Sequence, residues 1–331
     1  MKKLILILLL LLLASLVLRG KVVTLSDLVK PRHIAVDEHQ IYIIEGTTVF
    51  IYSLNDFKLK KKFGKEGEGP QEFKRRIIQV NIQPDCIFLN SAGKVSYFKK
   101  DGKFIKERRA ISPDMRLTPF GNEFVGGRSL AENNTLYFFI GIYDTNLKKI
   151  KDVYKQERAV QMGGKGTKVF AHPLPYYTDE DNLFIVKGKD LVIDVLDKAG
   201  EKRYSITYDY KRINVTADDK KRVLDHLKTD PETKPYLEMI KPIIFPGYFP
   251  AIRNYYIADK KIYVLTYKQK NDKTECFIFD MKGTFLKQVF LPYVYVNPVD
   301  EYPAAIKNGR LYQLIENEGT EEWELHITGI K

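Results

Sequence analysis

Cysteine is scarce in this sequence, because only Cys86 and Cys276 occur among 331 residues. So few cysteines exclude a small scaffold held together by disulfides. Both lie inside apolar, strand-like runs, DCIFL and TECFIF. We therefore predict two buried, free thiols.

Motifs for metal, cofactor or nucleophilic chemistry are also missing. The five histidines lie far apart, with no HxH or HxxxH spacing and no cysteine pair beside them. No GxSxG motif marks a nucleophilic serine, and no GxxxxGK[ST] motif marks a phosphate-binding loop. We therefore expect no cofactor and assign no catalytic and no metal-binding residue.

Long apolar runs are absent except at the start of the chain. Lys2 and Lys3 precede an apolar run from Leu4 to Leu13 that continues with little interruption to Leu18. This pattern is typical of a secretory signal, and the run is short for a membrane-spanning helix. Residues 1–20 are thus predicted to be a signal peptide or an uncleaved N-terminal anchor. The protein is expected to be exported, periplasmic or extracellular, with membrane contact only through that N-terminus.

Charge is unbalanced towards positive, with a formal net charge of +12. Three of these charges, Lys2, Lys3 and Arg19, lie in the N-terminal segment. The remaining basic residues form scattered doublets and triplets, which are typical of solvated strand edges and turns. We expect no nucleic-acid partner, whereas an anionic glycan remains open.

Strand-like segments recur along the rest of the chain. The clearest copies are QIYIIEGTTVFIYSLNDFKLKKKFG, DCIFLNSAGKVSYFKKDGKFIKE and KIYVLTYKQKNDKTECFIFDMKGTFLKQVF. With two weaker copies, the outer hairpins turn at Asp56, Gly102, Asn146, Gly200 and Gly283, so the first three intervals are 46, 44 and 54 residues and the fourth is 83. A period in the forties with about four strands per unit is typical of a β-propeller. The fold class is therefore all-β, with residues 21–331 forming a six-bladed β-propeller of four-stranded antiparallel blades.

The last interval is longer than the others by about 35 residues and contains a helical pattern. Residues 216–219, TADD, have the form of a capping box, and three apolar residues follow on one helical face: Val223, Leu224 and Leu227. Prolines at 231 and 235 end this helix before a second short one at 236–240. We predict a helical insert at about 215–243, between blades four and five, as a packing element or a lid.

The sixth copy supplies only three strands before the chain ends. Residues 21–25, KVVTL, precede the first innermost strand and have no blade of their own. We predict that they pair beside residues 322–328 and close the ring, leaving no open sheet edge. Cys86 and Cys276 would then lie in opposite blades, too far apart for a disulfide.

The connector FGKEGEGPQEF, residues 63–73, follows the first copy. It lacks the lysine and hydroxyl of a phosphate loop, so we interpret Gly64, Gly67, Gly69 and Pro70 as a tight crossing between blades, with Phe73 packed between sheets. With the repeats, this connector resembles those of exported six-bladed propellers of the TolB-like and NHL-repeat-related group. That resemblance implies a binding or scaffold module, or an enzyme with an axial site.

Five residues are candidates for lining the central channel. On the alignment of the repeats, His33 in blade one and His172 in blade four are expected to face the channel, joined by Arg32, Arg116 and Arg253. A cluster richer in arginine than in carboxylates would suit an anionic group. The alternative interpretation is that these side chains only fill or solvate the channel mouth.

The expected function is a non-catalytic, monomeric exported propeller that binds a protein, peptide or anionic glycan. It rests on the resemblance and on the lack of a catalytic motif, because the fold itself does not establish function. The alternative is a lactonase- or lyase-like propeller enzyme with an axial active site, so whether the protein is an enzyme stays open.

Overall fold

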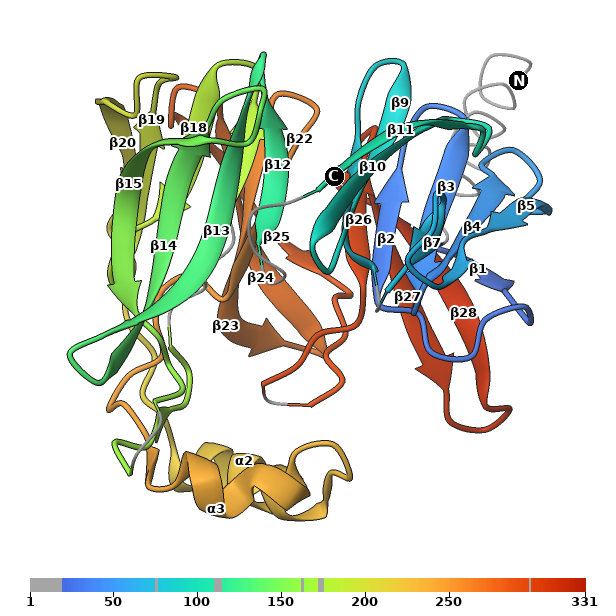
Figure 1. Cartoon of the computed structure of the whole chain (residues 1–331). Helices are drawn as coiled ribbons and strands as arrows, with labels where there is room; N and C mark the ends of the chain where they lie inside the picture. Colours follow the sequence, from blue (N-terminus) through green and yellow to red (C-terminus); the bar gives the residue numbers. More distant parts are fainter. Residues whose placement is uncertain (1–19, 75–76, 110–114, 162–163, 172–175, 298) are drawn as a thin grey trace, which may run out of the picture.

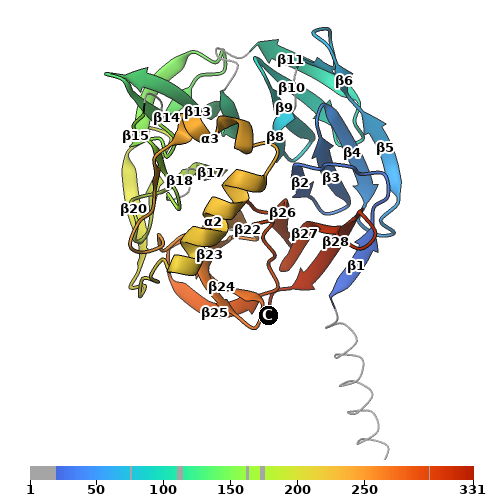
Figure 2. The same cartoon turned by 90° about the horizontal axis from the view of Figure 1, so that it is seen from below.

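The computed structural model describes residues 20–331, apart from 75–76, 110–114, 162–163, 172–175 and 298. Six four-stranded antiparallel sheets are arranged around a central axis (Figures 1 and 2). The predicted six-bladed β-propeller is therefore confirmed.

Each blade runs from an innermost to an outermost strand. Blades one to three consist of β2 (His33–Val36), β3 (Gln40–Glu45), β4 (Thr48–Ser53) and β5 (Leu59–Phe63); β8 (Ile77–Ile82), β9 (Cys86–Ser91), β10 (Lys94–Lys99) and β11 (Phe104–Arg109); and β12 (Arg116–Phe120), β13 (Glu123–Glu132), β14 (Thr135–Tyr143) and β15 (Lys149–Glu157). Blades four to six consist of β17 (Tyr176–Asp179), β18 (Asn182–Val186), β19 (Leu191–Leu196) and β20 (Lys202–Tyr208); β22 (Asn254–Ala258), β23 (Lys261–Lys270), β24 (Lys273–Asp280) and β25 (Phe285–Leu291); and β26 (Ala304–Lys307), β27 (Arg310–Asn317), β28 (Glu322–Gly329) and β1 (Lys21–Thr24).

The hydrophobic core is divided into layers between neighbouring blades. One cluster joins blades one and two, for example through Ile44 and Leu89, and five similar clusters fill the other interfaces around the ring. Central strands such as β3 are buried on both faces, which explains their nearly continuous apolar sequences. Outermost strands such as β5 are lysine-rich and largely exposed.

The first and last blades are joined by β1. This strand pairs antiparallel with β28, from Lys21 opposite Ile327 to Thr24 opposite Glu324. Leu25 is 3% exposed and packs in the cluster between blades six and one. The predicted ring closure is confirmed.

All six innermost strands begin on one side of the ring, which we call the lower face. The hairpins between the second and third strands and the connectors between blades lie on this side as well. It is the lower side in Figure 1 and faces the viewer in Figure 2. Any residue just before an innermost strand therefore lies near the lower mouth of the ring.

The helical insert lies on the lower face between blades four and five, as predicted. It contains α2 (Ala217–Thr229), the 3-10 helix η1 (Lys234–Tyr236), α3 (Leu237–Ile240) and β21 (Ile243–Ile244). Figure 2 shows α2 lying across the middle of the ring. Val223 and Leu227 are buried, whereas Leu224 is only partly buried.

The insert has a second component that the sequence did not reveal. The linker between blades three and four contains β16 (Thr167–Lys168), which pairs in parallel with β21. Val169 and Phe170 from this linker pack with Val223 and Leu227 of α2. Two long connectors from different blade boundaries thus form one small core outside the ring.

The α2 capping box permits a stability test. The Asp219 amide donates to the Thr216 hydroxyl over 3.2 Å, and the Thr216 amide donates to the Asp219 carboxylate over 2.9 Å. Replacing Thr216 with Ala should destabilise α2 by about 1 kcal/mol. Hydrogen exchange of the α2 amides should become faster, whereas Thr229→Ala, outside the capping box, should change it little. Unchanged protection in Thr216→Ala would show that the cap does not hold the insert.

The stabilisation of α2 by this cap should depend on pH. Burial opposes ionisation of Asp219, but hydrogen bonds from Thr216 and the nearby Arg222 outweigh it and lower the pKa below its ordinary value of 3.8. A lowered folded-state pKa stabilises the fold above the unfolded value, and this stabilisation is lost as pH falls through the folded value. Exchange protection of α2 should therefore decline only below about pH 4.

The connector after blade one forms a two-stranded parallel crossing of β6 (Lys65–Glu66) and β7 (Glu72–Phe73). Gly64 has a φ of 91°, and a Cβ there would lie 2.3 Å from the Thr47 carbonyl oxygen. Gly67 also has a positive φ, whereas Gly69 instead donates its amide to the Glu72 carboxylate over 2.9 Å. Phe73 is fully buried between blades one and two, where it packs in the cluster that joins them.

The two cysteines are free, as predicted, but only Cys276 is buried. Cys86 is only half-buried because it begins β9 at a hairpin, which corrects the expectation of two buried thiols. Burial raises the pKa of Cys276 to about 12, so Cys86 should react first with a thiol reagent in the folded protein. Unfolding without reductant should expose two reactive thiols per chain, and a lower count would contradict the free state.

Candidate functional site

The lower face brings several predicted site residues to one side of the ring. Arg32 and Arg253 directly precede the innermost strands of blades one and five, and Arg116 begins that of blade three. His33 is the half-buried first residue of β2. His172 lies outside the described residues. Their expected roles in lining the channel and in binding a ligand stay predictions.

Arg32 holds the helical insert to blade one. Its guanidinium lies 3.0 Å from a carboxylate oxygen of Glu232, in the loop between α2 and η1, and Lys30 contacts the same oxygen. The hydrogen bond from Lys30 and the charge of Arg32 lower the pKa of Glu232. The loop between α2 and η1 is therefore attached to blade one by charged, exposed groups. The buried face of α2, with Val223 and Leu227, packs instead on an apolar core.

Arg253 is stacked in a different environment. Its guanidinium carbon lies 3.1 Å from the centroid of the Tyr295 ring and 5.0 Å from that of Tyr267. Such cation–π contacts stabilise a desolvated guanidinium. Arg253 is thus fixed in packing between blade five and the connector that follows it.

A polar network around Glu301 lies beside this stack. One Glu301 oxygen accepts hydrogen bonds of 2.7 Å from the Tyr293 hydroxyl and from the Asn254 amide. Burial, together with the negative charge of Glu301, raises the pKa values of Tyr256 and Tyr293 well above the ordinary value of 10. Both hydroxyls therefore remain protonated: that of Tyr293 donates to Glu301, and that of Tyr256 is hydrogen-bonded to the Tyr293 hydroxyl over 2.7 Å.

Arg116 is exposed and has a second arginine as its neighbour. Burial and the positive charge of Arg116 lower the pKa of Arg158, which follows β15. The three predicted arginines therefore occupy three separate environments. Sequence analysis missed Arg158, Glu232 and Glu301, because nothing in their local sequence distinguishes them from other surface charges.

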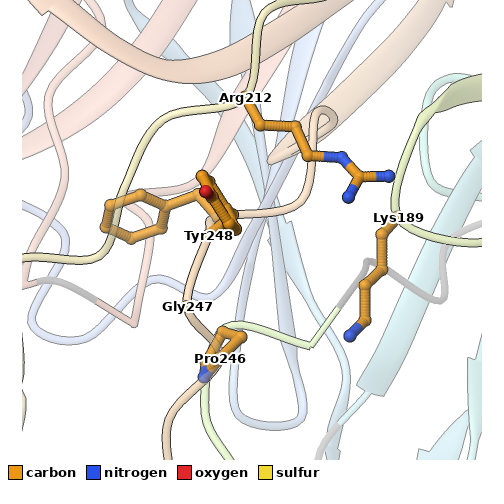
Figure 3. A pocket seen from close by; sticks show the side chains of 6 residues that line it. Lys189, Arg212, Pro246, Gly247 and Tyr248 are labelled. Carbon is orange, nitrogen blue, oxygen red and sulfur yellow. The ribbon is translucent and has the colours of Figure 1, made fainter.

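A small pocket lies where the insert rejoins blade five. It is lined by residues of three segments, shown in Figure 3: Lys189, Arg212, Pro246, Gly247, Tyr248 and Phe249. Its volume is about 110 Å³, well below the roughly 300 Å³ or more of pockets that bind drug-sized ligands. Arg212 is already paired with Asp190. The pocket can admit one side chain but not a large metabolite.

Exposed apolar side chains are concentrated on the lower face. Those on the insert, the inter-blade connectors and the β13–β14 hairpin are Val29, Leu130, Tyr236, Met239, Ile244, Tyr248, Val294, Val296 and Val299. Among the residues that the structure describes, the other large exposed apolar side chains lie on outer strands: Val22, Ile105, Ile150, Phe285 and Leu286. Clustered exposed apolar side chains are typical of interaction surfaces.

Metal-ligating side chains do not gather in the part of the chain that the structure describes. No group of three or more His, Cys, Asp or Glu residues there is arranged to hold a metal ion. Over the same residues, no helix is both long and apolar enough to cross a membrane.

The fold and this face define the class, a six-bladed β-propeller with a helical insert over one mouth. No protein-family profile matches the sequence, and no curated protein sequence is significantly similar to it. The structure is similar to that of a Bacteroides fragilis protein described as exported, with a TM-score of 0.57, 12% identity, and coverage of 95% of this chain and 96% of that one. It is also similar to a Bacteroides vulgatus member of the DUF4221 family, with a TM-score of 0.51, 9% identity and the same coverages. At these identities the likeness shows the fold alone.

Proposed function

We propose that this protein is an exported binding module that docks a protein partner on its lower face. The observation that carries the proposal is the concentration of exposed apolar side chains on that face, while the exposed outer strands are mainly polar. Protein interfaces combine apolar contacts with arginine and aromatic residues, which the lower face also supplies. Aliphatic side chains such as Met239 and Val296 favour a protein or peptide over a glycan.

Export is part of the same proposal. It is supported by the basic and then apolar segment at residues 1–20, which has the pattern of a secretory signal. The similar Bacteroides fragilis protein is itself described as exported. Membership in the TolB-like and NHL-related group rests on the connector at residues 63–73. The alternative of a lactonase- or lyase-like enzyme stays a prediction that metal analysis of the purified protein would test.

Site-specific photocrosslinking in cells that produce the protein tests the docking face. A photoreactive residue would replace Met239 or Val296 on the lower face, which are 54% and 51% exposed. Ile105 and Leu286, at 45% and 46% exposed on outer strands, are the matched controls. We expect discrete protein adducts from the lower-face positions and none from the controls. Equal adducts from all four positions, or none from Met239 and Val296, would contradict the proposal.

A further inference from the structure

Arg116 and Arg158 both reach the same stretch of β13 on the lower part of blade three, because Arg116 lies opposite Gly127 in the ladder and Arg158 is hydrogen-bonded to the side chain of Ser129, two residues further along. Arg158 is half-buried, and its Nη1 donates to the Ser129 hydroxyl over 3.2 Å. Its guanidinium carbon lies 6.0 Å from the centroid of the Phe138 ring. Among the described residues, neither arginine forms an ion pair with a carboxylate, whereas Arg128 on the same sheet is paired with Asp152.

The surrounding structure holds these two arginines in place. Arg116 lies opposite Gly127 in the ladder between β12 and β13, and the Tyr176 hydroxyl donates to the Arg116 carbonyl. A Cβ on Gly127 would lie 2.5 Å from the Phe138 ring and 3.0 Å from the Tyr176 ring. Glycine at this position therefore lets both rings pack against the strand, beside the two arginines.

Such an arrangement is unfavourable without an anion. Partial burial of Arg158 removes water from its charge, and the like charge of Arg116 adds repulsion. A carboxylate can accept two parallel hydrogen bonds from one guanidinium and cancel charge on both. Ser129 supplies a further hydroxyl next to Arg158.

We infer that Arg116 and Arg158 bind an Asp or Glu carboxylate of the protein partner. This inference rests on the proposed function, because it names the chemistry by which that partner is recognised. The exposed Leu130 on β13 and the aliphatic residues of the lower face favour a peptide carboxylate, flanked by apolar side chains, over the uronate of a glycan.

NMR of the arginine Nε–Hε groups tests the site directly. The purified protein would be titrated at constant ionic strength with the capped peptide acetyl-Leu-Glu-Leu-amide and with its uncharged counterpart acetyl-Leu-Gln-Leu-amide. We expect saturable shifts of Arg116 and Arg158 with the Glu peptide, and at least about tenfold weaker binding of the Gln peptide. Arg128 and Arg222, which are paired with Asp152 and Asp219, should not shift.

Substitutions can distinguish binding at Arg116 and Arg158 from a general effect of the protein's positive charge. Arg158→Gln should abolish the saturable response, whereas Arg203→Gln, the same charge change on an outer strand, should preserve it. Arg116→Gln changes an exposed side chain and keeps the test available if Arg158→Gln does not fold. Responses that do not saturate, or equal binding of both peptides, would overturn the inference. Tighter binding of glucuronate than of the Glu peptide would overturn the peptide assignment.

The two proposals can fail separately. Crosslinks from Met239 and Val296 that persist while the titration fails would reject the carboxylate site and leave the docking face intact. A saturable titration without any crosslinks would instead reject the lower face as the docking surface in cells. That result would also overturn the inference that the carboxylate bound by Arg116 and Arg158 belongs to a partner docked on the lower face.

Discussion

Replacing Phe73 with Ala should lower the free energy of unfolding by about 3 to 5 kcal/mol, as for other buried aromatic residues. The Phe73 side chain is fully buried and packs with residues of blades one and two, including Phe98, whose ring centroid lies 6.3 Å away. Its truncation would leave a cavity between two sheets that the connector itself fastens together. Chemical denaturation of the wild-type and variant proteins measures the loss.

Tyr236→Ala is the matched control for this experiment. Tyr236 is 58% exposed on the insert, so its truncation should change the unfolding free energy by less than about 1 kcal/mol. A Phe73→Ala protein as stable as the control would show that the connector is a loop on the surface rather than a crossing between blades.

A chain that begins at Ser26, and so lacks β1 and Leu25, should lose more than about 3 kcal/mol of unfolding free energy. Removal of the buried Leu25 side chain alone corresponds to roughly 2 to 5 kcal/mol, and each lost ladder hydrogen bond adds roughly 0.5 to 1.5 kcal/mol. The deletion also exposes the edge of β28, which should promote aggregation. Ring closure is therefore expected to depend strongly on this short strand.

Trp323 reports this loss locally. It lies on β28, is 6% exposed, and donates its indole N–H to the Val29 carbonyl over 2.9 Å. Its fluorescence in a urea titration should change at a lower denaturant concentration in the truncated protein. Val22→Ala, at a 51% exposed position of β1, should leave the midpoint unchanged. An unaltered midpoint after truncation would refute a closing role for the strand.

The site was predicted less completely than the fold. The alignment of repeats selected Arg32, Arg116 and Arg253 as candidates for lining the channel, and the structure places them at or directly before innermost strands. The alignment did not reveal that Arg32 pairs with Glu232, or that Arg116 lies near Arg158. Ion-pair partners far apart in the sequence carry no local signal, since any surface charge is compatible with the same strand pattern.

The sequence by itself determined the repeated blades, the closing strand and the position of the helical insert. These features follow from local periodicity, turn residues and the need to cover sheet faces and edges, all of which are present within short segments. Only the tertiary structure decided that the linker after blade three joins the insert and which side chains meet on the lower face. Such contacts form only when the blades close into a ring. The ring brings together residues that are far apart in the sequence, and their sequence separation does not predict how close they lie in space.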